Sequence, residues 1–351
     1  MSEGIDYRAA AAAVAADFGL AGAAIAPITI GLINQTFLVT GTAGGRHVLQ
    51  CLHPIFPGAV NANIEAVTRH LEARGVPTPR LVPTRDGRLW LEREGRVWRL
   101  LTHVAGITHQ TMPDEAHAFA AGRALARFHT ALADLDHVFP RLRPPVHDLA
   151  RHLAALEAAL EECRAHARHA EAAAAAREIL ARAAELPPLP QAPARVVHGD
   201  PKLSNFIFGA AGECLALVDL DTVGRGPLVF DLGDAFRSWC NPAGEDAEHG
   251  CFVLPLFAAA LEGYAAAARD FMTPAECEAL VPATLTLHLE LAARFCADAL
   301  HERYFGWDPA RYASRGEHNL VRARNQLAAA NALRERRAAA EAVVARVFAA
   351  A

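Results

Sequence analysis

The stretch His198-Gly199-Asp200-Pro201-Lys202-Leu203-Ser204-Asn205, followed by Asp219-Leu220-Asp221, decides the fold of this 351-residue chain. Apolar residues flank the first segment, with Val196 and Val197 before it and Phe206 to Phe208 after it. Such runs predict short strands on both sides, so the polar segment is predicted to be a loop held by buried elements.

Four side chains of this segment match the needs of phosphoryl transfer. That reaction needs a carboxylate that orients and deprotonates an attacking hydroxyl, oxygen ligands for Mg²⁺, and a cation at the transferred group. These groups are supplied by Asp200, Asn205, Asp219 and Lys202. The spacing Asp-x-Lys-x-x-Asn is that of a kinase catalytic loop, with Gly199 in place of the arginine. Taken singly, a His-Gly-Asp turn or an Asp-Leu-Asp pair is common, but the combined order indicates a kinase.

Lys202 has a further property that supports this interpretation. It is the only lysine among the 34 basic residues, and the others are arginine. Lysine offers a compact point charge where arginine offers a wide planar fork. A chain that uses arginine almost everywhere has therefore kept an ammonium where a single phosphoryl oxygen would be met.

Composition excludes several other classes of protein. A formal charge of -5 gives no basic field for a nucleic acid backbone, so no nucleic acid partner is expected. No run of about 18 uncharged apolar residues occurs, so no membrane span is expected. The seven cysteines are scattered and odd in number, and the alanine-rich start lacks the pattern of a signal peptide. These features predict reduced thiols and a cytoplasmic protein.

The first hundred residues have mainly strand patterns and the rest of the chain has mainly helix patterns, which predicts an α+β fold with two lobes. Residues 28–52 suggest a hairpin around Gly41 to Gly45, residues 61–73 a helix, and residues 80–83, 88–92 and 97–102 further strands. A helix is also expected over residues 5–24, which are dominated by alanine. Beyond residue 104, helices are expected at 113–133 and 148–186 and from 254 onward, with short strands at 195–197, 206–208 and 214–220. A small β-rich lobe (1–103) and a large helical lobe (104–351) would leave a cleft for a small ligand.

The loop resembles that of the aminoglycoside phosphotransferase and choline kinase family of small-molecule kinases. The longer string from Leu217 to Thr222, with Asp231-Leu232-Gly233-Asp234-Ala235-Phe236-Arg237 after it, resembles the N-acetylhexosamine 1-kinase branch. The likeness extends from about residue 28 to 335 and includes the segments Gly31–Phe37, Val48–Gln50, Trp98–Leu100, His147–Arg151 and Arg294–Asp298.

The resemblance implies a protein-kinase-like fold with ATP between the lobes and a role for each matching residue. Asp200 would be the catalytic base, Lys202 a γ-phosphate contact, and Asn205 and Asp219 the Mg²⁺ ligands. The segment Gly31 to Thr36, including Asn34, would lie over the phosphates, and a hinge at Arg99, Leu101 and His103 would read adenine. The implied acceptor site contains His147, Asp148, Arg151, Glu290, Arg294 and Asp298.

The third strand departs from the kinase pattern. Many kinase-like folds place a lysine or arginine there, paired with a helix glutamate. This strand reads His47-Val48-Leu49-Gln50-Cys51-Leu52-His53, with Gln50 at the cation position, so Arg46 or His53 is considered as a substitute. Glu65 is then either the pairing glutamate or a solvated helix residue.

Several polar groups have structural alternatives. Asp231 is predicted to accept hydrogen bonds from the loop backbone, and His198 to anchor the loop, because buried polar groups need partners. Glu290, Arg294 and Asp298, four residues apart, are either a surface ion-pair ladder or a stripe facing the substrate. Glu162, Cys163, His166 and His169 imitate a metal site but are interpreted as a solvated helix face.

The sequence thus predicts an ATP- and Mg²⁺-dependent kinase, a monomer or a homodimer, that phosphorylates a small hydroxylated molecule. The acceptor hydroxyl is expected to be the anomeric one of a hexose or N-acetylhexosamine. An aminoglycoside, amino alcohol or nucleoside is the alternative acceptor. A nucleotide-binding pseudokinase without turnover is the alternative from another class of protein, because of the missing third-strand cation.

Overall fold

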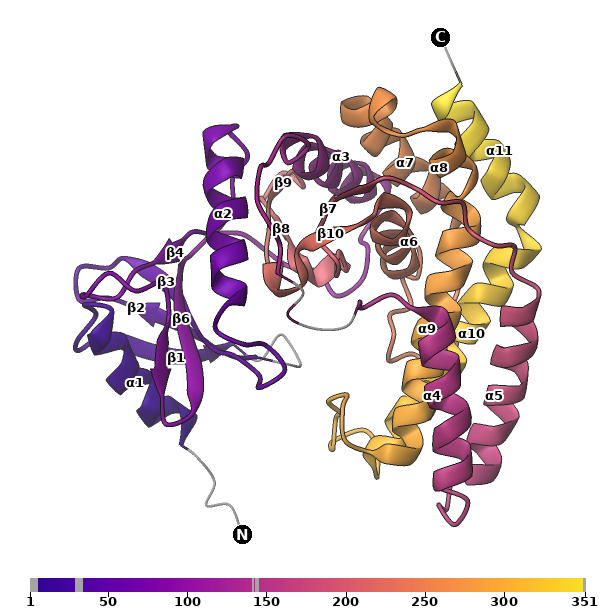
Figure 1. Ribbon diagram of the computed structural model, residues 1–351, viewed down its shortest axis with the longest axis horizontal. Coiled ribbons are helices and arrows are strands. Elements are labelled where there is room, and N and C mark those ends of the chain that lie inside the picture. The colour runs from indigo at the N-terminus through magenta and orange to yellow at the C-terminus, as the bar shows by residue number, and fades with distance from the viewer. Residues whose placement is uncertain (1–5, 29–33, 141, 143–144, 350–351) are drawn as a thin grey trace. The chain divides into compact units, whose positions relative to one another are not determined.

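The computed structural model describes residues 6–28, 34–140, 142 and 145–349. The chain divides into two compact units, Met1–Ala105 with Asp134–Pro144, and Gly106–Ala133 with Pro145–Ala351. The division lies two residues beyond the expected boundary at 103. Residues 134–144 rejoin the first unit, which the sequence interpretation did not foresee. Each unit is described separately, and Figure 1 shows their elements.

The first unit is built on an antiparallel sheet of order β1-β2-β3-β6-β4, with β5 also paired to β6. The strands are β1 (Ala24–Ile28), β2 (Gln35–Thr40), β3 (Arg46–Cys51), β4 (Leu81–Val82), β5 (Leu91–Arg93) and β6 (Arg96–Thr102). The predicted hairpin around Gly41 to Gly45 is confirmed as the β2–β3 connection. Gly44 has a φ of +84° there, a conformation that glycine adopts without strain.

Helix α1 (Tyr7–Asp17) covers one face of this sheet. Its buried residues share a core with inward-facing residues of the sheet, namely Phe37, Val39, Leu49, Cys51, Trp98 and Leu100. The expected helix over 5–24 ends early, at Asp17, because Gly19, directly after the C-cap residue Phe18, has a φ of +83° that a helix cannot continue through. The second helix, α2 (Val60–Ala73), matches the prediction and buries Ile64, Val67 and Leu71.

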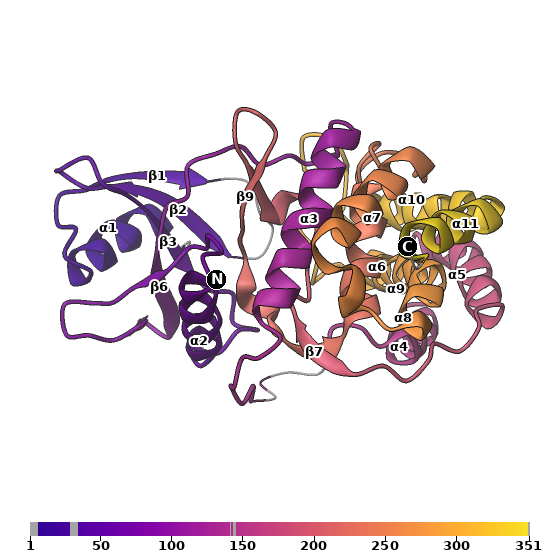
Figure 2. The same cartoon turned by 90° about the horizontal axis from the view of Figure 1, so that it is seen from above.

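The second unit is mainly helical and surrounds α9 (Leu280–His301), of which nearly every residue is buried. Figures 1 and 2 show α4, α6 and α10 running beside α9. The helices are α3 (Glu115–Ala131), α4 (Leu149–Glu162), α5 (His169–Ala184), α6 (Leu228–Trp239), α7 (Leu254–Ala268), α8 (Pro274–Glu278), α9, α10 (Arg315–Glu335) and α11 (Arg337–Phe348). Among the described helices, no segment is both long and apolar enough to cross a membrane.

Two small antiparallel sheets of two strands each flank the polar loop at 198–205. The first pairs β7 (Ala194–Val197) with β10 (Gly224–Pro227), and the second pairs β8 (Phe206–Phe208) with β9 (Cys214–Leu217). The strands predicted on either side of the loop are therefore present. Phe206, Phe208 and Trp239 are fully buried beneath it, so the loop rests on a packed core.

Candidate active site

Asp231 on α6 fixes the backbone at the start of the loop. Its carboxylate accepts hydrogen bonds from the backbone N–H groups of His198 (2.8 Å) and Gly199 (2.6 Å), and from His129 Nε2 (2.9 Å). Only 1% of Asp231 is exposed. The structural role predicted for this carboxylate is confirmed, since a buried acid needs such donors.

His198 anchors the other side of the loop, as predicted. Its Nε2 donates to the Val218 carbonyl oxygen (3.0 Å), and its Nδ1 accepts from the Asp200 backbone N–H (3.4 Å). Burial lowers the pKa of His198, although Asp231 and Asp200 act in the opposite direction. A neutral ring with its proton on Nε2 satisfies both hydrogen bonds.

Gly199 is required by the shape of the turn. It has a φ of +81°, and a Cβ at this position would lie 2.6 Å from the Thr222 carbonyl oxygen. The Thr222 hydroxyl donates to the carbonyl oxygen of His198 (2.7 Å) and so holds Thr222 against the turn. The arginine of the protein kinase loop therefore could not stand here without a change of backbone.

Asp200 and Lys202 form an ion pair at the centre of the loop. Lys202 Nζ lies 2.7 Å from Asp200 Oδ2, and the side chains are 36% and 29% exposed. Burial opposes ionisation of Asp200, but the charge of Lys202 outweighs it and lowers the pKa of the carboxyl. Burial also disfavours the Lys202 ammonium, but Asp200 and Asp219 raise its pKa above the ordinary value. Both groups are charged near neutral pH.

Asn205 and Asp219 offer oxygen atoms suited to a hard divalent cation. The Asn205 amide nitrogen donates to the Asp200 carbonyl oxygen (2.8 Å), which leaves the amide oxygen as the ligand atom. The Val218 N–H donates to the Asn205 carbonyl oxygen (2.9 Å), so Asp219 follows directly beside Asn205. Asp219 has a φ of +64°, a strained conformation that clusters at functional sites. The two residues fit a Mg²⁺ ion that would complete its shell with phosphate and water oxygens.

A buried arginine with two carboxylate partners lies close to the loop at 198–205. Arg237 on α6 donates to Asp234 (2.8 Å) and to Glu245 (2.5 Å), and its own charge favours ionised Asp200. Burial together with Arg237 lowers the pKa of His288 to about 3, so this buried imidazole is neutral. The sequence interpretation gave no role to Arg237, although a lone arginine in an apolar helical stretch is a signal for a buried ion pair.

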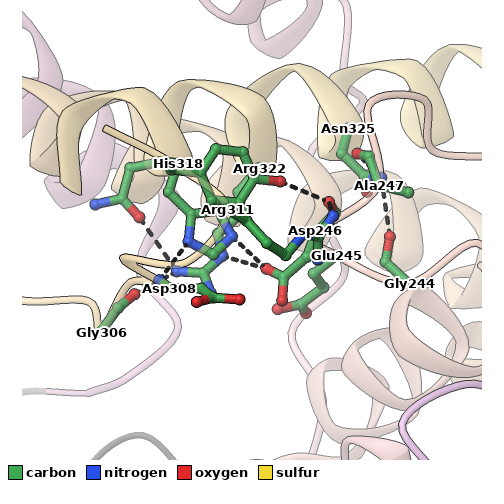
Figure 3. Close-up of polar contacts among 12 residues, drawn as sticks. Gly244, Glu245, Asp246, Ala247, Gly306, Asp308, Arg311, His318, Arg322 and Asn325 are labelled. Atoms are coloured by element: carbon green, nitrogen blue, oxygen red, sulfur yellow. Dashed lines mark hydrogen bonds and ion pairs between the residues drawn. The ribbon is translucent and has the colours of Figure 1, made fainter. Parts of the chain in front are cut away.

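The segment that contains Glu245 is held in place by α10 (Figure 3). Asp246 accepts from His318 Nε2 (2.9 Å) and Arg322 Nε (2.6 Å), while Arg322 Nη1 also donates to the Gly306 carbonyl oxygen (2.6 Å). Asn325 donates to the carbonyl oxygens of Gly244 and Ala247, each at 2.9 Å. These bonds join two loops to one helix, so the position of Glu245 near Lys202 is fixed by packing.

Four of the predicted acceptor residues meet at the start of α4. His147 Nδ1 lies 3.0 Å from Glu290 Oε1, and the Asp148 backbone N–H donates to Glu290 Oε2 (2.8 Å). Burial disfavours the charged imidazole, but Glu290 outweighs it and raises the pKa of His147. Asp148 caps α4 by accepting from the Arg151 N–H (3.1 Å), and Arg151 donates to the Pro145 carbonyl oxygen (2.6 Å). Asp148 and Arg151 thus have helix-capping contacts.

Arg294 and Asp298 lie further along α9 and have other partners. Arg294 lies over the rings of Tyr304 (6.0 Å) and Phe305 (5.4 Å). Asp298 is buried and accepts from the backbone N–H groups of residues 303, 304 and 305 and from Asn319. Four donors occupy its two oxygens, so Asp298 orders a loop. These contacts therefore fit neither a surface ion-pair ladder nor a continuous stripe that faces a substrate.

The predicted nucleotide residues lie in the first unit, except that Gly31 falls outside the described residues. Asn34 Oδ1 accepts from the His53 N–H (2.9 Å). The side chains of Thr36, Gln50 and Arg99 are joined by hydrogen bonds across the sheet. Arg99 and Leu101 lie within β6, where their backbones pair with Gln50 and Val48 of β3. Of the residues assigned to the hinge, His103 lies just beyond this strand.

Two further predictions concern Glu65 and residues 162–169. Glu65 forms ion pairs with Arg69 on the same helix (2.7 Å) and with Arg80 beyond it (3.1 Å). His166 pairs with Glu302 (3.1 Å), and His169 contacts the Leu160 carbonyl oxygen. In the part of the chain that the structure describes, no group of three or more His, Cys, Asp or Glu residues could hold a metal ion. The prediction of a helix face over residues 162–169 is wrong, because α4 ends at Glu162 and α5 begins at His169, so Cys163 and His166 lie in the turn between the two helices.

The fold and the anchored aspartate loop are typical of the protein-kinase-like class. Residues 24–278 match the model of the "Phosphotransferase enzyme family", and the chain belongs to this family. The N-acetylhexosamine 1-kinase branch remains a finer prediction.

Curated relatives include homoserine kinases. That of Burkholderia cenocepacia is 32% identical over 116 residues, 33% of this chain and 34% of the relative. The match to the first curated relatives thus spans about a third of their length. The homoserine kinase of Allorhizobium ampelinum is 27% identical over 72% of this chain and 74% of the relative.

Solved structures with the same fold include two small-molecule kinases. A microcompartment-associated aminopropanol kinase has a TM-score of 0.62 and 15% identity, covering 95% of this chain and 98% of its own. An amicoumacin kinase in complex with AMP-PNP, Ca²⁺ and Ami has a TM-score of 0.60 and 16% identity, covering 87% of each chain. At these identities the likeness concerns the fold.

Proposed function

We propose that the protein transfers the γ-phosphoryl group of ATP to a hydroxyl of a small molecule, with Asp200 as the base. The observation that carries this proposal is the ionised Asp200, held by an anchored loop beside Lys202, Asn205 and Asp219. In the part of the chain that the structure describes, the hydrogen bonds to the Asp200 carboxylate fall on Oδ2. Oδ1 is then the atom that accepts the proton of the acceptor hydroxyl.

The other residues of the loop have separate tasks. Lys202 neutralises charge on the transferred phosphoryl group, because its ammonium is a compact donor of fixed position. Asn205 and Asp219 would hold Mg²⁺, which neutralises charge on the phosphates when it is bound. Asp231 and His198 keep the loop in one conformation, and this preorganisation reduces the cost of aligning the acceptor oxygen.

Hydroxylated amines are the acceptors that we place first. The relatives named above are kinases of homoserine and aminopropanol, both of which carry an amine and a hydroxyl. Amine recognition also agrees with the alternative acceptor class drawn from the sequence.

A hexose is the second candidate, supported by a different observation. His147 Nε2 is buried and has no hydrogen-bond partner within the described residues. Glu290 raises the pKa of His147 against the effect of burial and so favours the protonated ring, in which this nitrogen would donate to an oxygen atom. A sugar hydroxyl or a carboxylate would satisfy it, whereas an ammonium group would not.

An acceptor panel with ATP and Mg²⁺ tests the proposal. Homoserine, aminopropanol, ethanolamine, an aminoglycoside, hexoses and N-acetylhexosamines would be compared by release of ADP, and phosphorus NMR would locate the new phosphate ester. Acceptor-dependent ADP release is expected, first with the amines. Nucleotide binding without any acceptor-dependent release would instead favour the pseudokinase.

A further inference from the structure

Three charged residues of α9, Glu290, Arg294 and Asp298, are spaced four residues apart and lie along one side of the helix. Glu290 and Asp298 are only 2% and 4% exposed, and donors of the protein occupy the oxygens of both carboxylates. Arg294, between them, is half-buried. Within the residues that the structure describes, its guanidinium group has no carboxylate or carbonyl partner. The cation in the middle of this row is therefore available to a ligand.

His147 supplies a second donor close to Arg294. Its Nδ1 lies 3.0 Å from Glu290 Oε1, and its Nε2 is buried without a hydrogen-bond partner among the described residues. Glu290 favours the protonated imidazole, whereas the charge of Arg294 acts against it, so the two cations are near enough to repel each other. A negatively charged group that contacts both would remove this repulsion and satisfy the buried nitrogen.

The guanidinium group of Arg294 is held by the rings of Tyr304 and Phe305. The ring centroids lie 6.0 Å and 5.4 Å from its central carbon atom. Asp298 accepts from the backbone N–H groups of both residues, and α10 holds the next carbonyl oxygen, that of Gly306 (Figure 3). A guanidinium group over aromatic rings keeps its N–H groups free, because they point along its own plane. Tyr304 is 49% exposed, so a ligand can reach this part of α9.

The net charge of these residues suits a monoanion. Arg294 and protonated His147 carry two positive charges and Glu290 carries one negative charge, which leaves one positive charge uncompensated. A carboxylate balances that charge and presents two oxygens, which match the parallel N–H groups of an arginine. A phosphate dianion would instead place excess negative charge beside Glu290. The charge balance therefore favours a carboxylate.

Interacting charges connect this carboxylate-binding position with the catalytic loop inside the second unit. The charge of Asp234 on α6 acts on His147. Asp234 pairs with Arg237 (2.8 Å), whose charge acts in turn on Asp200. All of these residues belong to the same compact unit. A molecule held at Arg294 and His147 would therefore direct its remaining groups toward the base.

We infer that Arg294 and His147 bind a carboxylate of the acceptor, so that the acceptor is a hydroxy acid or an amino acid with a side-chain hydroxyl. This inference rests on the proposed function, since it names the substrate class of the same site. It also separates the relatives named above, because homoserine carries a carboxylate and aminopropanol does not. A neutral hexose lacks this group as well.

The test compares acceptors that differ in the carboxylate. Homoserine would be compared with straight-chain aminopropanol, which is homoserine without its carboxylate, and with γ-hydroxybutyrate, which is homoserine without its amine. On the whole chain, kcat/KM would be measured from acceptor-dependent ADP release and affinity by calorimetry. The wild type should prefer both acids to aminopropanol. In Arg294→Gln both acids should lose about ten- to a hundredfold, the range for a charged hydrogen bond, while aminopropanol changes by less than about twofold.

Three further variants separate a specific contact from a general disturbance of the site. Arg303→Gln removes an exposed arginine from the neighbouring loop and should leave the preference for acids within about twofold of the wild type. Arg294→Lys keeps the charge without the planar fork and should retain part of the preference. His147→Gln leaves Glu290 a polar partner and should weaken both acids by about three- to tenfold, without affecting aminopropanol.

Three results would overturn the inference. The first is an equal loss for homoserine and aminopropanol in Arg294→Gln, the second is a wild type that does not favour the acids in turnover or in affinity, and the third is an equal loss of preference in Arg303→Gln. Failure of the proposed function looks different, because the acids would bind in an Arg294-dependent way while no acceptor would cause release of ADP.

Discussion

Asp231→Asn tests whether the catalytic loop is held by one buried carboxylate. Two backbone N–H groups and His129 Nε2 donate to Asp231, which is 1% exposed. An asparagine keeps one acceptor oxygen and turns an NH₂ group toward another donor, so at least one buried N–H loses its partner. Each such loss costs about 1–3 kcal/mol, and we expect about 2–4 kcal/mol in total. For a unit of this size that lowers Tm by roughly 5–15 °C.

The rate should fall together with the stability. Because a displacement of the base by about 1 Å costs on the order of a hundredfold in rate, kcat of Asp231→Asn should fall by roughly that factor while KM for the acceptor changes little. Thermal unfolding and steady-state kinetics would be measured beside Asp270→Asn, which removes an exposed carboxylate from the same unit. A Tm within about 2 °C of the wild type, with kcat unchanged, would refute the anchoring role.

The contribution of Asp231 to the stability of the fold should depend on pH in a definite direction. Burial opposes ionisation, but the hydrogen bond and charge of His129 outweigh it and lower the pKa from the ordinary 3.8. A lowered pKa contributes stability that is present above the ordinary value and is lost as pH falls through the folded-state value. The Tm difference between wild type and Asp231→Asn should therefore be largest near neutral pH and shrink below 3.8. A difference that grows toward acid pH would contradict this account.

Three other substitutions test the remaining assignments. Lys202→Arg keeps the charge but widens the donor, so kcat should fall at least roughly tenfold with little change in acceptor KM, and a fully active variant would mean that any cation suffices. Asp219→Asn should raise the Mg²⁺ concentration for half-maximal rate, because a neutral amide retains a hard cation poorly, and an unchanged Mg²⁺ titration would make Asp219 structural. Asp298→Ala leaves several loop N–H groups without an acceptor and should lower stability by about 2–4 kcal/mol in urea unfolding, while a changed acceptor KM without loss of stability would return Asp298 to the substrate site.

The site could be predicted from sequence where its parts are close in the chain. Asp200, Lys202 and Asn205 lie on one short loop, and the strands on either side are visible as apolar runs. Asp231 could be assigned because a carboxylate in an apolar helix must find donors, and a nearby loop offers them. The helix–sheet division also followed from local periodicity, although glycine conformations shortened α1.

Contacts between distant segments were not accessible in this way. Arg99 meets Gln50 only because β6 pairs with β3 in one register, and a shift by one residue would turn Arg99 toward the α1 core. Sequence reasoning therefore did not foresee the hydrogen bonds from Arg99 to Gln50. Asp298 shows the same limit, since spacing on a helix does not reveal whether a polar face meets a substrate or a neighbouring loop.

The most direct test of the central claim measures turnover and nucleotide binding in Asp200→Ala. The accepted substrate from the panel would be used for kcat, and ATP affinity would be measured by calorimetry on the same preparation. A positioned base contributes on the order of 10²–10⁴ in rate, so we predict a loss of kcat in that range with ATP affinity within about threefold of the wild type. A variant that keeps more than about a tenth of the wild-type kcat would contradict the assignment of Asp200 as the base.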